Sequence, residues 1–175
     1  MKKLTKFRRR GGMKPIAVFD PKVDTSYIDV EKNMKEWRRR VGESRAEEAR
    51  AIFYGRPESQ RKRGRATLPN LLAEAWAKKT GYQYEIECDV GWSRPDLVVF
   101  YAEGAAVFRV QGDYWHNLAH VAAKDRAQRD MFFQSGFSIR GNVVWQVVDV
   151  WEKDIYISES AFVTALEKEK NSGRH

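Results

Sequence analysis

The sequence predicts an α/β fold in which helices flank a mixed β-sheet and a basic helical extension precedes it. After residue 66, segments with helical spacing alternate with short β-branched and aromatic segments in the order α, β, β, β, α, β, α. The first 66 residues contain 20 Lys and Arg but 9 Asp and Glu, a net charge of +11, whereas residues 67–175 contain 12 and 15, a net charge of −3. The chain therefore divides where the charge changes sign.

Residues 1–66 are expected to form a basic arm, a helical extension and a linker. Between residues 30 and 54 the apolar side chains follow a helical spacing that is interrupted near Gly42. The run 55–66 contains glycine, proline and five basic residues with almost nothing apolar, which is typical of a linker. We place the domain boundary there, so that residues 67–175 form a second domain.

The second domain is expected to begin with a helix that is capped by Thr67 and ends at Gly81. Two consecutive strands are joined by a turn at Glu103-Gly104, and Ser158 is expected to cap the last helix. The expected helices are 68–79, 116–135 and 158–170, and the expected strands are 82–90, 96–102, 105–111 and 143–151.

The composition excludes several classes of protein. No apolar run approaches the ~20 residues that span a bilayer, and no apolar stretch follows the basic N-terminus as it would in a secretory signal. We therefore expect a protein without a membrane partner, in the cytoplasm. Cys88 is the only cysteine, which excludes an internal disulfide and a cysteine-rich zinc site. Any bound metal must be held mainly by oxygen ligands.

The basic N-terminal part suits a polyanion, because each neutralised phosphate releases condensed counterions. A membrane surface is a poorer partner, since the segment lacks the apolar face of an interfacial helix. A solvated tail is the alternative for a charge run of this kind. The residues expected to contact DNA are Arg8, Arg9, Arg10, Arg38, Arg39, Arg40, Arg61, Lys62, Arg63 and Arg65.

The segment that carries chemistry is 94–100, followed after one hairpin turn by 105–116. Asp96 begins one strand, and polar residues end the strand that pairs with it. Such groups can converge on one point and hold a divalent cation, because Mg²⁺ takes oxygen ligands and binds through one or two carboxylates together with substrate phosphate. The sequence therefore predicts a site for Mg²⁺, for which Mn²⁺ can substitute.

These motifs resemble the PD-(D/E)XK nucleases of the restriction-endonuclease-like superfamily, in which an aspartate after proline and an acid-x-lysine pair share the site. Pro95-Asp96 fits the first half, but the second half reads Arg109-Val110-Gln111. The similarity is stronger to the very-short-patch-repair endonucleases, which share Arg94-Pro95-Asp96 and a glycine that leads into Trp115-His116. The resemblance covers about residues 68–166 and implies the αβββαβα core of that superfamily.

The resemblance assigns roles residue by residue. Asp96 matches the metal aspartate, and Gln111 and His116 stand where the repair enzymes have two active-site histidines. Those enzymes also use a glutamate from the helix before the first strand, for which Glu74 is the candidate and Asn70 a rival occupant. The expected catalytic residues are Asp96, Gln111, His116 and Glu74. The expected metal ligands are Asp96 and, as a residue that could supply a second carboxylate independently of the resemblance, Asp113.

Each assignment has a plainer alternative. Asp96 can cap a turn, and His116 can be an ordinary first-turn residue of a helix. His116 and His120 could form a ligand pair on one helix face, but this spacing is a weak zinc signal. Asp113 could point into solvent, and Trp115 is more typical of a core than of a base-stacking site. A helical ion-pair network accounts for Asp125, Arg129 and Asp130.

The favoured function is that of a metal-dependent deoxyribonuclease acting on double-stranded DNA, in repair, in homing-type cleavage or in the processing of phage or mobile-element DNA. In this interpretation Asp96 holds Mg²⁺, Gln111 orients water or metal, and His116 or Glu74 assists proton transfer. The first alternative is a catalytically degenerate nuclease-fold protein that binds DNA or has a structural role, since Arg109 places a cation where the family has a metal ligand. The second is an RNA-binding accessory protein. A homodimer or larger assembly is compatible with the sequence.

Overall fold

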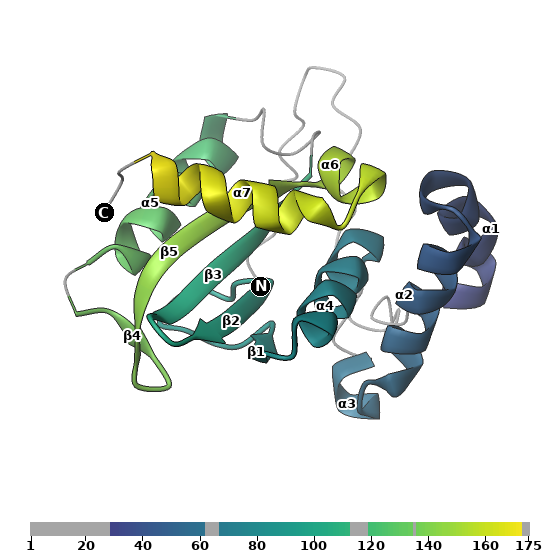
Figure 1. The fold of residues 1–175 in the computed structure, drawn as a ribbon, viewed down its shortest axis with the longest axis horizontal. Helices are drawn as coiled ribbons and strands as arrows, with labels where there is room; N and C mark the ends of the chain where they lie inside the picture. The colour runs from purple at the N-terminus through teal and green to yellow at the C-terminus, as the bar shows by residue number, and fades with distance from the viewer. Residues whose placement is uncertain (1–28, 62–66, 113–118, 135, 173–175) are drawn as a thin grey trace, which may run out of the picture.

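The computed structural model describes residues 29–61, 67–112, 119–134 and 136–172. Its elements confirm the predicted α/β fold, with N-terminal helices followed by a curled mixed sheet and interspersed helices (Figure 1). The expected order of seven elements is present, with β4 and α6 in addition. The helices are α1 (Val30–Val41), α2 (Glu43–Gly55), α3 (Glu58–Arg61), α4 (Leu68–Thr80), α5 (Ala119–Phe132), α6 (Glu152–Ile157) and α7 (Ser160–Asn171). The strands are β1 (Gln83–Ile86), β2 (Leu97–Tyr101), β3 (Gly104–Gln111), β4 (Ser138–Ile139) and β5 (Asn142–Trp151).

The five strands lie in the order β1-β2-β3-β5-β4, and only β3 and β5 pair in parallel. The hairpin between β2 and β3 turns at Gly104, whose φ of +138° and proximity to β5 both require glycine. A Cβ at this position would lie 2.3 Å from the carbonyl oxygen of Val143. The parallel pair needs a crossover connection, and α5 lies within it.

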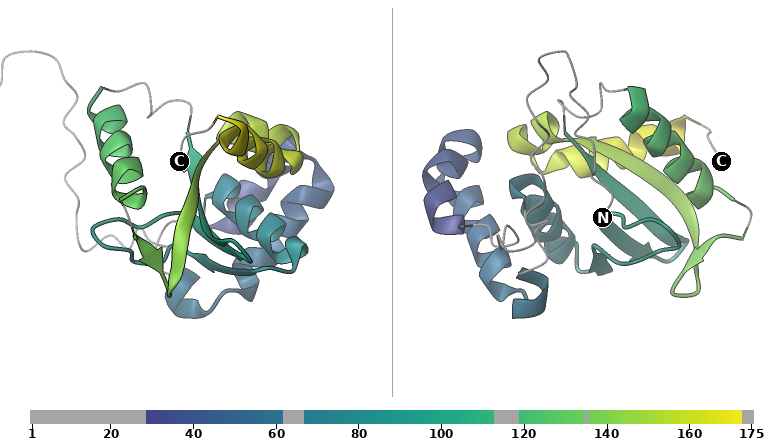
Figure 2. Two further views of the ribbon diagram at one scale, coloured as in Figure 1. Left: turned by 60° about the vertical axis from the view of Figure 1, so that its left-hand side comes forward. Right: turned by 180° about the vertical axis from the view of Figure 1, so that it is seen from behind.

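The sheet separates two apolar clusters. Because side chains alternate along a strand, Phe108 faces α4 and α7 whereas Val107 faces α5. The first cluster also contains Trp76 of α4, which stacks on Phe162 of α7 with ring centroids 4.7 Å apart. The second contains Phe132 of α5. Figure 2 shows the curled sheet between α5 on one side and the remaining helices on the other.

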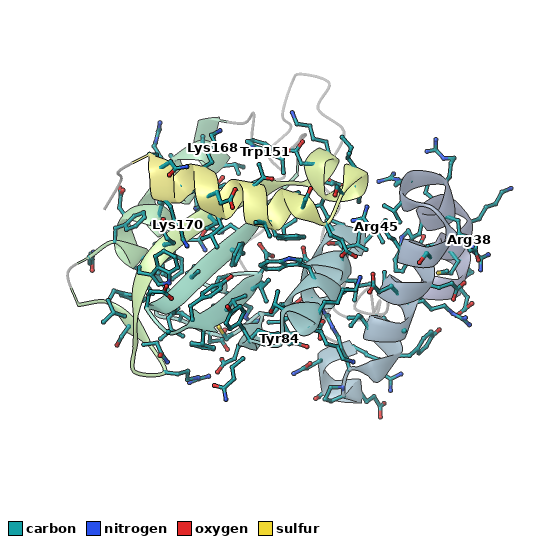
Figure 3. The ribbon with its side chains drawn as sticks, in the orientation of Figure 1. Arg38, Arg45, Tyr84, Trp151, Lys168 and Lys170 are labelled. Carbon is teal, nitrogen blue, oxygen red and sulfur yellow. The ribbon has the colours of Figure 1, made fainter. Side chains whose placement is uncertain are left out.

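The N-terminal helices extend the first cluster. Asp29 caps α1 through the backbone N–H of Lys32, and the break between α1 and α2 falls at Gly42, where φ is +81°. On α2, Ala46, Ala49 and Phe53 are buried, and they belong to the same cluster as the apolar face of α4. Figure 3 shows Arg45 reaching from α2 toward α6, where it donates to the carbonyl oxygens of Ile155 and Tyr156. The extension therefore packs on the core.

Several local expectations are corrected. The first part of the predicted linker is ordered: Arg56 is buried, and the short helix α3 follows it. α6 occupies the residues between the expected last strand and last helix, to which no element was assigned. Ser158 is not the N-cap of α7, which begins at Ser160, although its hydroxyl oxygen accepts the N–H of Ser160 at 3.1 Å. None of the helices in the described ranges is long and apolar enough to cross a membrane.

Candidate active site

A cleft of about 710 Å³ opens where β2 begins and β3 ends, between the 89–95 loop and α5. Asp96, Arg109, Gln111 and Lys124 are among the residues that line it. The structure thus brings Asp96 and Gln111, which are distant in sequence, to one cleft. Lys124, an exposed cation on α5, was not singled out by the sequence.

The Asp96 carboxylate is held from two sides. Its Oδ2 accepts the backbone N–H of Val110 on β3 at 2.8 Å, and its Oδ1 accepts Nδ2 of Asn70 on α4 at 3.1 Å. These partners lie 14 and 26 residues away in sequence, so the bonds are tertiary contacts and differ from the local cap of a turn.

α4 presents Asn70, and not Glu74, to the Asp96 carboxylate. Glu74 is 9% exposed, and its Oε2 accepts both Nε and Nη2 of Arg56 at 2.7 Å. Neither Glu74 nor Asn70 lines the cleft, but Asn70 donates to the Asp96 carboxylate. Of the two candidates from this helix, the geometry therefore favours Asn70, which was the rival occupant, as the residue that supports Asp96.

The acid-x-lysine positions are occupied by a buried ion pair and an amide. Arg109 lies opposite Asp149 on β5, and its Nε and Nη2 donate to Asp149 Oδ1 and Oδ2 at 2.6 and 2.7 Å. Arg129 of α5 donates Nη1 to the same Oδ2 at 3.2 Å. Burial by itself would raise the pKa of Asp149, but the hydrogen bonds and charges of Arg109, with help from Gln111 and Arg129, hold that pKa below its ordinary value. Asp149 is therefore an ionised acceptor at neutral pH.

Gln111 shares this face of the sheet with Arg109 and is 4% exposed. Its Nε2 donates to Asp149 Oδ1 at 2.8 Å. Its Oε1 is buried and accepts no hydrogen bond from the residues that the structure describes. An amide with one end bonded and the other unsatisfied is a feature that needs a physical explanation.

The acidic partners of Arg129 differ from those expected from the sequence. It donates Nη2 to Glu169 of α7 at 2.6 Å, in addition to its bond with Asp149. A helix ion-pair network within α5 was the sequence interpretation for this residue, but these partners lie on β5 and α7. The contacts connect three elements around the end of the parallel strand pair.

A rigid turn forms the rim of the cleft. Val90 and Ser93 exchange backbone hydrogen bonds of 2.8 and 3.0 Å, and Trp92 on this turn is 58% exposed. Ser93 also bonds through its hydroxyl to Gln128 of α5, and Arg94 pairs with Asp89 at 2.6 Å. A large aromatic surface is therefore presented at the cleft on a fixed support.

Many of the basic residues of the extension are paired with acids. Arg39 and Arg40 both contact Glu36 at 2.7 Å, and Arg38, on the side of α1 away from the sheet (Figure 3), contacts Glu43 and Glu47. Within residues 29–61 there are 9 Lys and Arg and 7 Asp and Glu, so this stretch has a net charge of only +2. Arg61 is the last residue of α3. Its Nε is buried and forms no hydrogen bond with the residues that the structure describes.

The other predicted site residues lie outside the described residues: Arg8, Arg9, Arg10, Lys62, Arg63, Arg65, Asp113 and His116. In the described ranges, no group of three or more His, Cys, Asp or Glu gathers as a metal site. The Asp96 carboxylate still fits Mg²⁺ or Mn²⁺, because a hard cation can bind through one or two carboxylates and complete its shell with water and phosphate oxygens.

Asp149 is the functional candidate that the sequence did not reveal. It stands in β5, whose residues are mostly apolar, and its importance becomes apparent only from its pairing with Arg109. The signal was an acid among apolar residues of a strand, but its partner is visible only after the register of β3 and β5 is known. Comparison of the chain with protein-family models, curated proteins and solved structures yields no match.

Proposed function

We propose that this protein is a metal-dependent nuclease that hydrolyses phosphodiester bonds of double-stranded DNA at the Asp96 cleft. One observation carries the proposal: the Asp96 carboxylate is fixed by Asn70 and the Val110 N–H at the end of a hairpin, in a cleft that it shares with Gln111 and Lys124. In metal-assisted phosphodiester hydrolysis a carboxylate can hold the metal ion, a cation can stabilise charge on the phosphate, and an amide can orient water.

A bound Mg²⁺ or Mn²⁺ would supply Lewis-acid polarisation of the phosphate and a more acidic water. The chain's own part is to hold and align the reactants. Asp96 binds the cation, Lys124 adds positive charge beside the phosphate, and Gln111 orients the attacking water. The water oxygen bonds to phosphorus as the bond from phosphorus to the leaving sugar oxygen breaks. The water loses a proton and the leaving oxygen gains one, with His116 the predicted carrier.

DNA binding in this proposal comes from charge and from stacking. Residues 1–28 and 62–66 together hold 11 Lys and Arg and 2 Asp and Glu, so most of the basic excess of the N-terminal part falls there. Trp92, exposed on its rigid turn at the cleft, provides a face on which a nucleobase can stack. Such a protein would act in the cytoplasm on nucleoid or phage DNA, as a monomer, a homodimer or a larger assembly.

The second candidate is a catalytically degenerate protein of the same fold that binds DNA without cutting it. The Arg109–Asp149 ion pair favours this candidate. At the position of Arg109 the PD-(D/E)XK nucleases have an acid that binds metal, whereas here a buried cation is neutralised by Asp149. The double change Arg109→Glu with Gln111→Lys restores that family pattern. Activity created in an inert parent would identify the degenerate protein.

The test is nicking of supercoiled plasmid with Mg²⁺ or Mn²⁺, with the Asp96→Asn variant as control. A nuclease nicks the plasmid, requires the cation, and loses activity in the variant while its melting temperature stays near that of the parent. Nicking that survives in Asp96→Asn at the parent level contradicts the proposal. DNA binding without nicking in the parent supports the second candidate.

A further inference from the structure

We propose that Asp149 is a positioning residue that fixes the side-chain amide of Gln111, with its NH₂ group turned toward Asp149 and its Oε1 left to hold the attacking water. The inference rests on the proposed nuclease function and deepens it, because it assigns the orientation of the nucleophile to a residue outside the motif positions.

The chemistry of the neighbours determines which way the amide faces. Asp149 Oδ1 receives Nε of Arg109 at 2.6 Å, and Oδ2 receives Nη2 of Arg109 at 2.7 Å and Nη1 of Arg129 at 3.2 Å. A carboxylate between two guanidinium groups can only accept hydrogen bonds. The donor end of the amide must therefore face Asp149, as the 2.8 Å contact from Gln111 Nε2 has it. The reversed amide would place two acceptors against each other.

The orientation is held rigidly. Arg109 and Gln111 are 5% and 4% exposed, and Arg109 also donates Nη1 to the carbonyl oxygen of Asp125 at 2.7 Å. Arg129 is tied to Glu169 at 2.6 Å. Rotation of the Gln111 amide would break its bond to a carboxylate that β3 and α5 both hold in place, so the side chain is pre-organised before a substrate arrives.

The remaining end of the amide points to a ligand. Oε1 is buried and has no hydrogen-bond donor among the described residues, on a side chain that lines the cleft with Asp96. A buried acceptor left unpaired is unfavourable, and a water that donates a hydrogen bond to it removes that cost. An amide oxygen accepts a hydrogen bond but is a very weak base. It therefore aligns the water without taking its proton, which is a different role from that of a lysine or a histidine.

A double-mutant cycle tests the role in catalysis. Single-turnover cleavage of duplex DNA with Mn²⁺ is compared for the parent, Asp149→Asn, Gln111→Ala and the double variant, with Asp154→Asn as a matched loss of an exposed carboxylate on α6. Because Asp149 acts through Gln111, we expect each single variant to lose more than about tenfold in rate and the double variant to lose no more than Gln111→Ala. Losses that multiply in the double variant overturn the positioning role.

The orientation itself has a readout that does not depend on cleavage. In protein labelled with ¹⁵N-glutamine, the side-chain NH₂ signal of Gln111 is identified by its loss in Gln111→Ala. We expect slow hydrogen exchange of this NH₂ group in the parent and in Asp154→Asn, and fast exchange in Asp149→Asn. Fast exchange in the parent overturns the orientation, whether or not the variant folds. A parent that does not cleave DNA contradicts the nuclease function and with it the water-holding role, while the exchange rate still decides the orientation.

Discussion

Arg109 and Asp149 lie directly opposite each other on the parallel strands β3 and β5 and form a two-point ion pair with distances of 2.6 and 2.7 Å. The side chain of Arg109 is 6% exposed and that of Asp149 is 27% exposed. A guanidinium buried to this extent depends on its counter-charge, since an unpaired buried cation is strongly unfavourable. The pair therefore contributes to stability in a pH-dependent manner.

Asp149→Asn should lower the free energy of unfolding by about 3 kcal/mol at pH 7, because it leaves Arg109 buried without its charge partner. The pKa of Asp149 is lowered in the folded protein, so its stabilising effect is present above the ordinary carboxyl pKa of about 4 and is lost as the pH falls through the lower folded-state value. Urea unfolding of parent and variant from pH 7 to pH 3 measures this. If the difference in unfolding free energy between parent and variant stays constant below pH 4, the arginines do not lower the pKa of Asp149.

Asn70→Ala should lower the cleavage rate but not the stability, and Glu74→Gln should lower the stability but not the cleavage rate. Asn70 supports the Asp96 carboxylate at 3.1 Å, so its loss should reduce the cleavage rate about 10–100-fold with little change in melting temperature. Glu74 pairs with buried Arg56, so Glu74→Gln should destabilise the fold by about 3 kcal/mol while the folded fraction cleaves at nearly the parent rate. Rate and melting temperature are measured together. The reverse pattern would give Glu74 the catalytic role predicted from the sequence.

The salt dependence of DNA binding should distinguish the arm from the helices. Changing Arg8, Arg9 and Arg10 to Gln should reduce the slope of log affinity against log salt by ~0.9 for each phosphate that is no longer neutralised. The same change at Arg38, Arg39 and Arg40 should have a smaller effect, because Glu36, Glu43 and Glu47 already pair with these arginines. Fluorescence anisotropy of a labelled duplex between about 50 and about 200 mM salt gives both slopes. Equal slopes in parent and arm variant would indicate that the arm does not bind phosphate.

Trp92→Leu should weaken binding of a single-stranded oligonucleotide by about 1–3 kcal/mol, the contribution of one aromatic stack, and Trp92→Phe should restore most of it. Trp151→Leu is the matched control, because Trp151 is also partly exposed, at 39%, but does not line the Asp96 cleft. Affinity is measured by anisotropy at fixed salt. Equal losses in the Trp92 and Trp151 variants would argue against a specific stacking site on the turn.

The sequence predicted the α/β class and the order of seven main elements because the signals for these elements are local. Gly42 separates two helices, Gly81 ends α4 in a left-handed conformation, and the alternation in β2 and β3 identifies strands joined by a tight turn. α6 was missed because its six residues are too few for helical spacing to distinguish them from the end of a strand.

The site was less predictable, because its partners come from distant elements. The sequence indicated that Asp96 and Gln111 share a hairpin, and the structure places both at one cleft. It could not indicate that Asp149 lies beside Gln111, since this depends on the parallel register of β3 and β5 across 38 residues of chain. Nor could helical spacing decide between Asn70 and Glu74, which lie one turn apart on α4.

The most direct measurement of the central claim is the rate of cleavage of duplex DNA with Mg²⁺ or Mn²⁺ in two isosteric variants, Asp96→Asn and Asp89→Asn. Both carboxylates line the cleft, but Asp96 is held by Asn70 and Val110 whereas Asp89 pairs with Arg94 at the rim. If Asp96 is the metal ligand, Asp96→Asn should lose more than about a thousandfold in rate and Asp89→Asn less than about tenfold, with both variants folded. A folded Asp96→Asn variant that cleaves DNA as fast as the parent would contradict the account.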